Sequence, residues 1–109
     1  MTTDLQLLRQ RINTADERIR KHVRQTYLEH SPVLSNLCGG SVYCKLENLQ
    51  HTGSFKLRGA FNKVLSLTEA ERNNGIVTSS SGNHGAGVAY VLNALKQYGT
   101  VYVPENVVP

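Results

Sequence analysis

The sequence contains little cysteine and no long apolar run. Its 109 residues include two cysteines, Cys38 and Cys44, which are six positions apart and make no CxxC pair. This spacing fits neither a disulfide framework nor a zinc site, so we expect free thiols in a reducing compartment. The first apolar residues alternate with Arg and Gln, which argues against a signal peptide, and no stretch predicts a membrane-spanning helix. We therefore expect a cytoplasmic protein.

Acidic and aromatic residues are also scarce. The chain has 12 Lys and Arg against 8 Asp and Glu, and six of the basic residues lie in the first 24 positions. This asymmetry leaves nucleic-acid binding as one hypothesis. Asp16 and Glu17 interrupt the basic run, however, and no aromatic residue interleaves with it, so we expect a solvated helix face and no nucleic-acid partner. The four histidines lack the spacing of metal ligands, and we expect no metal site.

The first half of the chain predicts one long helix followed by short elements. Apolar residues recur at three- and four-residue steps, which predicts an amphipathic helix over residues 4–24. Beyond it we expect an extended piece at 26–29, a helical turn at 33–40 that ends in two glycines, and a strand at 42–46. The apolar residues of the long helix are Leu5, Leu8, Ile12, Ala15, Ile19 and Val23.

The second half predicts a strand–helix–strand unit. IleValThrSer at 76–79 is typical of a β-branched strand, the next helix extends to about residue 97, and ThrValTyrVal at 100–103 predicts another strand. A capping box of Thr68 and Glu71 predicts a short helix before this unit. Because the connections are short, we expect a parallel crossover, with the strand of the first half as a third strand. The fold class is therefore α/β, a parallel sheet with flanking helices.

A lysine stands where the start of a helix normally favours an acidic residue. Lys56 follows Thr52, Gly53 and Ser54, and the sequence predicts a helix over residues 55–67. Thr52 and Ser54 are N-cap residue types, and Gly53 permits a tight turn. Because the helix dipole opposes a cation in the first turn, Lys56 would either meet an anion or act as an amine of lowered pKa. A solvated surface lysine is the alternative.

A polar loop at residues 79–85 follows a predicted strand and begins the next helix. Its sequence, SerSerSerGlyAsnHisGly, offers backbone N–H groups, hydroxyls and an amide at a helix N-terminus, which suits a carboxylate or a phosphate. The alternative is that the serines only cap the helix, and His84 taken alone would more often be structural. The glycine spacing GxxGxG is not the dinucleotide-binding one, and Lys56 lacks the flanking residues of a Walker A loop.

An amine at one helix start and an anion-binding loop at another would lie near the same edge of the sheet. This arrangement suits a carbonyl cofactor or substrate bound covalently to lysine, with the carboxylate of an amino acid held opposite. Glu47 follows a strand end, and it would either line the same crevice or serve in a turn. We expect Arg58 to face solvent. Ordinary helix or strand packing is expected of Tyr90, Tyr98 and Tyr102.

At these residues the chain resembles the pyridoxal-phosphate enzymes of the serine/threonine dehydratase (threonine ammonia-lyase) family, in the tryptophan-synthase-β-like fold group. The matching pieces are LysLeuGlu at 45–47, ThrGlySerPheLysLeuArgGlyAla at 52–60 and SerSerGlyAsnHisGly at 80–85. Residues 26–103 follow the family order throughout. The resemblance implies a partial fragment, the N-terminal portion, of the fold type II architecture.

The resemblance also implies a role for each candidate site residue. Lys56 would form the internal Schiff base with pyridoxal 5'-phosphate, Phe55 would pack against the pyridine ring, and Asn83 would hydrogen-bond the 3-hydroxyl of the cofactor. The carboxylate of a small hydroxy amino acid would be bound by Ser80, Ser81, Asn83 and His84. The family reaction is β-elimination, in which the freed lysine takes the α-proton. Threonine would yield 2-oxobutanoate and serine would yield pyruvate, each with ammonia.

The sequence departs from the family pattern at several points. Tyr27 replaces a proline, and Ser81 stands where many threonine dehydratases have alanine, which resembles serine racemases that use this hydroxyl as an acid/base. The glycine-rich loop that binds the cofactor phosphate in longer members is missing. We therefore expect residues 1–50 to be the N-terminal helix and a segment of the large domain, and residues 51–109 to be an incomplete small domain. The alternatives are a serine racemase or a truncated, non-catalytic binding fragment, and we expect a homo-oligomer without a membrane partner.

Overall fold

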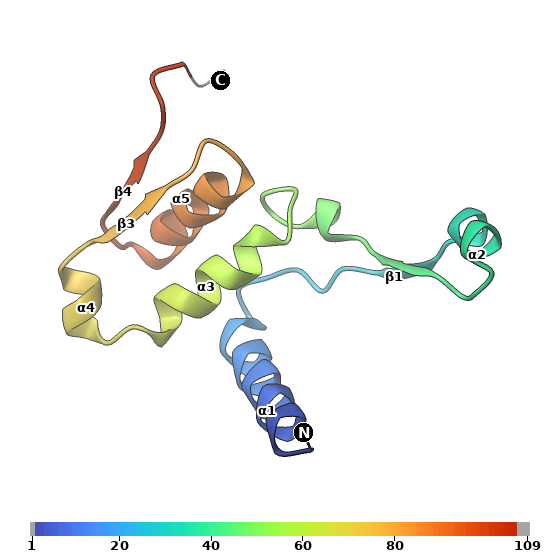
Figure 1. Cartoon of the computed structure of the whole chain (residues 1–109). Coiled ribbons are helices and arrows are strands. Elements are labelled where there is room, and N and C mark those ends of the chain that lie inside the picture. Colours follow the sequence, from blue (N-terminus) through green and yellow to red (C-terminus); the bar gives the residue numbers. More distant parts are fainter. Residues whose placement is uncertain (1, 107–109) are drawn as a thin grey trace.

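The chain folds into a packed unit and a projecting arm (Figure 1). The computed structural model describes residues 2–106. The packed unit comprises α3, α4, β3, α5 and β4, the arm comprises β1, α2 and β2, and α1 leads into the joint between them. The radius of gyration is 17.0 Å, against about 13 Å for a compact chain of this length, because α1 and the arm project. The elements are α1 (Thr2–Ile19), β1 (Leu28–His30), α2 (Pro32–Cys38), β2 (Tyr43–Lys45), a 3-10 helix η1 (Glu47–Leu49), α3 (Lys56–Ser66), α4 (Glu69–Asn73), β3 (Ile76–Ser79), α5 (Asn83–Leu95) and β4 (Gly99–Tyr102).

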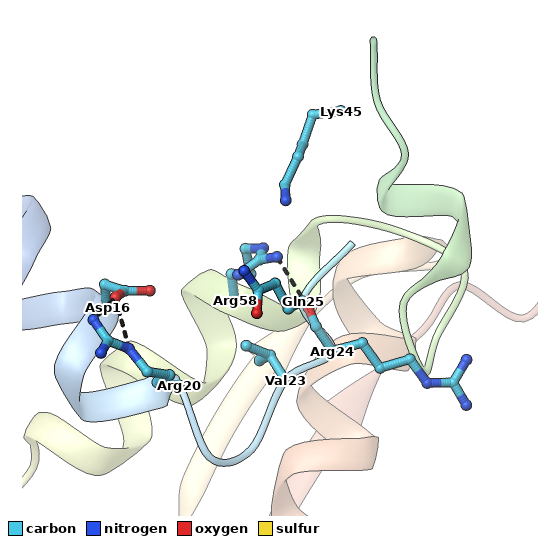
Figure 2. Close-up of a pocket in the computed structure, with 7 residues that line it drawn as sticks. All are labelled: Asp16, Arg20, Val23, Arg24, Gln25, Lys45 and Arg58. Carbon is cyan, nitrogen blue, oxygen red and sulfur yellow. Dashed lines mark hydrogen bonds and ion pairs between the residues drawn. The ribbon is translucent and has the colours of Figure 1, made fainter. Parts of the chain in front are cut away.

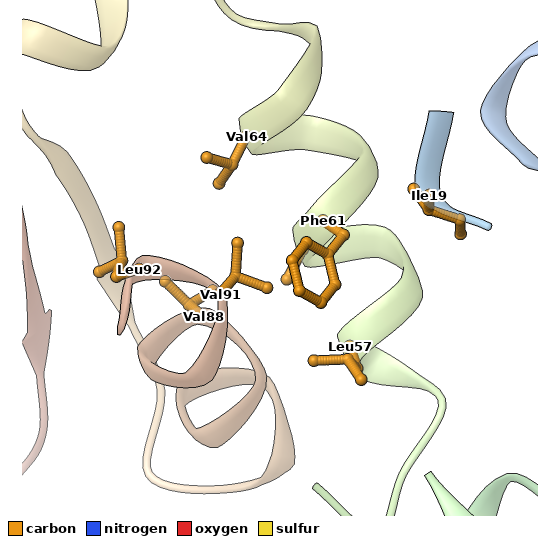
Figure 3. Close-up of a cluster of buried hydrophobic side chains, with 8 residues drawn as sticks. Ile19, Leu57, Phe61, Val64, Val88, Val91 and Leu92 are labelled. Carbon is orange, nitrogen blue, oxygen red and sulfur yellow. The ribbon is translucent and has the colours of Figure 1, made fainter. Parts of the chain in front are cut away.

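The packed unit is a parallel strand–helix–strand crossover that packs against α3. β3 pairs with β4 in parallel, from Ile76 opposite Gly99 to Ser79 opposite Tyr102, and α5 makes the connection. Apolar residues of α3 recur at steps of three and four and face α5 (Figure 3). The buried hydrophobic residues are Ile19, Leu57, Ala60, Phe61, Val64, Val88, Val91 and Leu92. The core therefore lies between α3 and α5, with one residue from the end of α1.

The arm is an antiparallel pair of short strands with α2 between them. The pairing begins with Leu28 opposite Lys45. Ser31 caps α2, because its Oγ accepts a hydrogen bond of 3.3 Å from the Leu34 N–H, and Gly39 ends the helix with a left-handed φ of +68°. No side chain of β1, α2 or β2 is buried. The arm is therefore held by backbone pairing and caps, without a core of its own.

The N-terminal helix differs from its prediction in length and in burial. α1 ends at Ile19, and the following residues turn towards α3, where the His22 ring stacks on the Phe61 ring with centroids 5.0 Å apart. This tertiary contact overrides the helical periodicity, which would have continued to residue 24. Three residues of the predicted apolar stripe are exposed, namely Leu5, Leu8 and Ile12. The described chain therefore covers only the last part of the stripe.

The predicted three-stranded sheet is wrong. The strand predicted at 42–46 forms as β2, but it pairs antiparallel with β1 and lies outside the β3–β4 sheet. An antiparallel pair needs only a short connection, which α2 and its turns provide, whereas η1, α3 and α4 separate β2 from β3 along the chain. Local pairing therefore decides where this strand goes, and the fold class stays α/β as predicted.

Several other predictions are confirmed, and one concerning tyrosines is not. The crossover is parallel, and the capping box forms, with the Thr68 N–H donating to the Glu71 carboxylate at 2.7 Å. Tyr90 packs edge-on to Phe61, as predicted for a helix residue in the core layer. Tyr98 and Tyr102 are exposed instead of packed. Tyr98 directly precedes β4 and Tyr102 is its last residue, and no described layer covers the outer face of the two-stranded sheet there.

Candidate functional site

Lys56 lies in the first turn of its helix, as predicted; it is the first residue of α3, and its side chain is exposed. Phe55 occupies the N-cap position, no side chain caps the helix, and the Lys56 Nζ lies 4.9 Å from the centroid of the Phe55 ring. The predicted caps are wrong: the hydroxyls of Thr52 and Ser54 are buried and have no hydrogen-bond partner among the described residues. Gly53 has a φ of +68°, which confirms the predicted tight turn. The turn therefore presents an accessible amine beside an aromatic face.

The loop at residues 80–84 joins the carboxyl end of β3 to α5. Gly82 occupies the N-cap position of α5, and no side chain caps this helix either. Ser80 instead accepts a hydrogen bond on its Oγ from the Gly82 N–H at 3.3 Å. Three side chains of the loop are exposed, those of Ser81, Asn83 and His84. The alternative that the serines only cap the helix is therefore wrong, and the uncapped first turn suits an anion.

Two glycines of α5 bring this loop and Lys56 to the same end of the helix pair. A Cβ on Gly87 would lie 3.3 Å from the backbone N of Leu57 and 3.4 Å from the backbone C of Lys56, so α5 sits directly on the first turn of α3. A Cβ on Gly85 would lie 2.7 Å from the backbone O of Ser80, so α5 also lies close against its own loop. The uncapped starts of α3 and α5 are therefore neighbours.

Arg58, which was expected to face solvent, forms a bidentate ion pair with Glu47. Its Nε and Nη2 donate to Oε2 and Oε1 of Glu47, each at 2.8 Å. The hydrogen bonds from Arg58 lower the pKa of Glu47, and the hydrogen bond to Glu47 raises the pKa of Arg58. Glu47 begins the turn η1, which is one of the two roles predicted for it. Sequence spacing carries no signal for the pair, because the partners are 11 positions apart across an irregular turn.

A cavity of about 490 Å³ lies beside this ion pair, and Lys56 does not line it (Figure 2). Its walls come from the end of α1, the segment that follows, β2 and α3. Every basic side chain of the wall has an acceptor within the chain. Arg20 binds Asp16, Arg58 binds Glu47, Arg24 binds the Leu49 carbonyl, and Lys45 binds the Thr26 carbonyl. The basic charge here therefore makes internal contacts.

Two other kinds of site are absent from the described part of the chain. Between residues 2 and 106, no helix combines the length and the apolar character that crossing a bilayer requires. No three His, Cys, Asp or Glu side chains of this range are grouped so that they could hold a metal ion. Cys38 and Cys44 are free thiols, as predicted. The amine of Lys56 and the loop at 80–84 are therefore the groups whose chemistry has to be explained.

Comparison with known proteins gives a consistent result. Residues 19–109 match the family model described as pyridoxal-phosphate dependent enzyme. The chain is 45% identical over 94 residues to the L-threonine ammonia-lyase of Thermotoga maritima, and the aligned region covers 86% of this chain and 23% of that protein. It is 41% identical over 106 residues to the catabolic L-threonine dehydratase of Escherichia coli, and the aligned region covers 97% of this chain and 32% of that protein.

The solved structures agree with the sequence relatives. The crystal structure of the serine racemase from Dictyostelium discoideum superposes with a TM-score of 0.83 at 42% identity, over 89% of this chain and 32% of that one. The chain thus spans between 23% and 32% of the length of these three proteins. With the fold of part of a fold type II enzyme and a family match over most of its length, this chain belongs to the family of pyridoxal-phosphate-dependent enzymes.

Proposed function

We propose that this chain is the lysine-bearing part of a dehydratase that converts L-threonine to 2-oxobutanoate, or L-serine to pyruvate, with release of ammonia. The observation that carries the proposal is the pair of neighbouring, uncapped helix starts, one with the Lys56 amine and the other with the loop at 80–84. An amine nucleophile beside an anion-binding loop suits an α-amino acid, whose carboxylate the loop would hold. Likeness to a threonine ammonia-lyase and a threonine dehydratase supports the choice of substrate.

The residues around Lys56 fit the cofactor of the family. An aldehyde cofactor requires an accessible amine, and the Lys56 side chain is exposed. Phe55 is also exposed, and its ring offers a face against which a flat aromatic ring can pack. The buried, unpartnered hydroxyls of Thr52 and Ser54 lie in the turn that leads to Lys56 and are suited to a further polar partner. When bound, pyridoxal phosphate supplies an electron-withdrawing ring that favours loss of the α-proton of the substrate.

In this proposal Lys56 acts twice. Its amine would hold the cofactor in the resting protein, and the same amine, when free, would accept the proton from the substrate Cα. Asn83 would hydrogen-bond the 3-hydroxyl of the cofactor. The β-hydroxyl of the substrate would leave as water with the proton that Lys56 had taken, and water would hydrolyse the released enamine to the 2-oxo acid and ammonia. The groups that would hold the substrate carboxylate are the first N–H groups of α5 with the side chains of Ser80, Ser81, Asn83 and His84.

Ser81 favours serine racemase as a second candidate function. Its hydroxyl is exposed directly before the N-cap residue of α5. A hydroxyl that faces the substrate on the side opposite Lys56 would return a proton to the other face of Cα and so invert it. Likeness to a serine racemase supports this candidate. Ser81→Ala should abolish formation of D-serine, measured by chiral chromatography, while dehydration through Lys56 continues.

We also propose that residues 1–50 belong to a large domain and residues 51–109 to a small α/β domain. The hydrophobic core supports this division, because Ile19 is its only buried member that precedes residue 51 in the described chain. The arm, which would be part of the large domain, contributes no buried side chain. Its apolar side chains are suited to packing against further parts of such a domain.

The full-length protein, mixed with pyridoxal phosphate, tests the proposed function. We expect a visible absorbance band from the bound cofactor, and borohydride should fix a pyridoxyl group on Lys56, located by mass spectrometry. L-Threonine and L-serine should then yield 2-oxo acids. Lys56→Ala should lose the attachment and the activity, whereas Lys63→Ala, which changes an exposed lysine of the same helix, should keep both. Attachment at another lysine, or 2-oxo acid from the Lys56→Ala variant, would contradict the proposal.

A further inference from the structure

The loop that presents Lys56 is closed at its base by a cluster of polar groups. We name it the clasp, and it consists of the side chains of Thr26, Glu47 and Arg58 with the backbone carbonyl of Arg24. We propose that the clasp holds Lys56 at a fixed place beside α5, with Glu47 and Arg58 as positioning residues. This inference rests on the role proposed for Lys56, but the contacts of the clasp are ones that this role does not use.

Glu47 and Arg58 stand at the two ends of the loop. Glu47 begins η1, and Arg58 lies in the first turn of α3. Their two hydrogen bonds of 2.8 Å close residues 47–58 into a ring. Within the ring, tight turns are made by hydrogen bonds from Gln50 N to Glu47 O, from Gly53 N to Gln50 O and from Arg58 N to Phe55 O. Closing both ends reduces the conformations open to the segment that carries Lys56.

The direction of Arg58 makes it a positioning residue. Arg58 follows Lys56 by two positions, which places the two side chains about 200° apart around the helix axis. Arg58 therefore points away from the side on which α3 presents the Lys56 amine. Its guanidinium binds Glu47 and the Arg24 carbonyl, the latter at 3.2 Å. The effect of Arg58 on any chemistry at Lys56 would pass through the backbone that both residues share.

The clasp is partly buried and its acceptors are occupied. The side chain of Glu47 is 13% exposed and that of Arg58 is 28% exposed. Besides its two bonds from Arg58, the Glu47 carboxylate accepts a hydrogen bond of 2.6 Å from the Thr26 hydroxyl. A bidentate, partly desolvated pair is stronger and more directional than an exposed one. The Asp16–Arg20 pair of α1, with side chains 49% and 70% exposed, offers a matched contrast.

Further contacts tie both ends of the arm to the clasp. The Gln50 amide brackets Arg24, accepting from its N–H at 3.1 Å and donating to its carbonyl at 2.6 Å. The Lys45 Nζ donates to the Thr26 carbonyl at 2.6 Å. The chain before the arm, the chain after it and the first turn of α3 are therefore held as one polar joint. Loosening the joint should free the loop without removing any residue of the hydrophobic core.

Hydrogen exchange of the full-length protein, measured without cofactor, tests the clasp directly. Glu47→Gln should accelerate exchange of the amides at residues 50–56 about tenfold, because the charge-assisted closure of the loop is lost. The amides in the middle of α5 should keep their rates. Arg20→Gln breaks an ion pair that lies outside the loop, keeps the Asp16 charge that acts on Arg58, and should leave both regions unchanged. Thr26→Val removes one hydrogen bond to Glu47 at nearly constant volume and should give a smaller acceleration confined to the same amides.

Kinetics of the cofactor-loaded protein give a second readout. Glu47→Gln should lower kcat about tenfold and leave KM for threonine within about twofold, since the loop at 80–84 is untouched. The exchanged pair, Glu47→Arg with Arg58→Glu, should restore part of the kcat and part of the protection from exchange at residues 50–56, as expected if the contact itself matters.

Two results would contradict the proposal that the clasp holds Lys56 in place. One is unchanged exchange at residues 50–56 in both Glu47→Gln and Thr26→Val. The other is equal acceleration in the loop and throughout α5, which would mean a general loss of stability. If the unaltered protein attaches no cofactor to Lys56, the proposed function fails, while the exchange rates still decide whether the clasp holds the loop.

Discussion

The packed unit contains two helices of 11 and 13 residues and has a hydrophobic core, whereas the arm contains two strands of 3 residues and a helix of 7 and has none. In the packed unit, α3 and α5 bury Leu57, Phe61 and Val91 almost completely. In the arm no side chain of residues 28–45 is buried, and Leu37 is 77% exposed. The difference follows from layering, because α3 and α5 cover one another, whereas no described layer covers either face of the β1–β2 pair.

The candidate site is supported in two different ways. Lys56 lies on the packed unit, at the point where the two ends of the arm join it. Burial of apolar side chains holds the helix that begins at Lys56, and directional polar contacts of Glu47 and Arg58 hold the loop before it. The two kinds of support should therefore fail under different substitutions and different conditions.

The largest expected effect comes from emptying the core of the packed unit. Phe61→Ala removes a fully buried ring that packs on His22 and Tyr90, and should lower the free energy of unfolding by about 3–5 kcal/mol. Leu37→Ala in the arm should change it by less than about 0.5 kcal/mol. Urea denaturation followed by circular dichroism measures both variants. Similar losses in the two variants would remove the distinction between the packed unit and the arm.

A smaller effect is expected where α5 sits on the first turn of α3. The Cβ of Gly87→Ala would press on the backbone of Lys56 and Leu57, which cannot move away as a flexible side chain would, and should cost about 1–3 kcal/mol. Gly59→Ala, in the interior of α3, meets no atom within 4 Å and should stabilise the protein by up to about 1 kcal/mol. Thermal unfolding compares the two. A neutral Gly87→Ala would show that the close approach of the helices is dispensable.

The smallest effect depends on pH and tests the joint between the two regions. Because hydrogen bonds from Arg58 lower the pKa of Glu47 from its ordinary value of 4.5, the pair adds stability above that pH and loses it as the pH falls through the lowered pKa. Glu47→Gln should therefore cost about 1 kcal/mol at pH 7 and flatten the decline of stability towards pH 3. Urea midpoints over this range provide the measurement, and a steeper acid decline in the variant would contradict the assignment.

Sequence patterns predicted those parts of the fold that depend on neighbouring residues. The capping box of Thr68 and Glu71, the tight turn at Gly53 and the placing of Lys56 in the first turn of a helix each involve residues within a few positions of one another. The parallel crossover follows from short connections, which are also local. The roles of Lys56, Phe55, Ser80, Ser81, Asn83 and His84 stay predictions.

Residues distant in the sequence account for what the patterns missed. α1 ends at Ile19, and His22 beyond it stacks on Phe61, which comes 39 positions later in the sequence. Arg58 faces Glu47 instead of solvent, since the turn between them folds back. Leu5, Leu8 and Ile12 recur with helical periodicity, but they are exposed, and no described element packs on them. Periodicity indicates which face of an element is apolar, but it does not say what will cover that face.

By itself, therefore, the sequence determined the order and type of most elements, the tight turn at Gly53 before Lys56 and the polar loop that follows β3. Propensities, caps and glycine conformations operate over a few residues, and they are legible in the chain. Only the tertiary structure decided which strands pair, which apolar faces are buried and where the Arg58 side chain points. Those outcomes depend on apolar burial and on hydrogen bonds between distant segments. Such contacts contribute to stability only after folding has brought the segments together, so the local sequence does not show them.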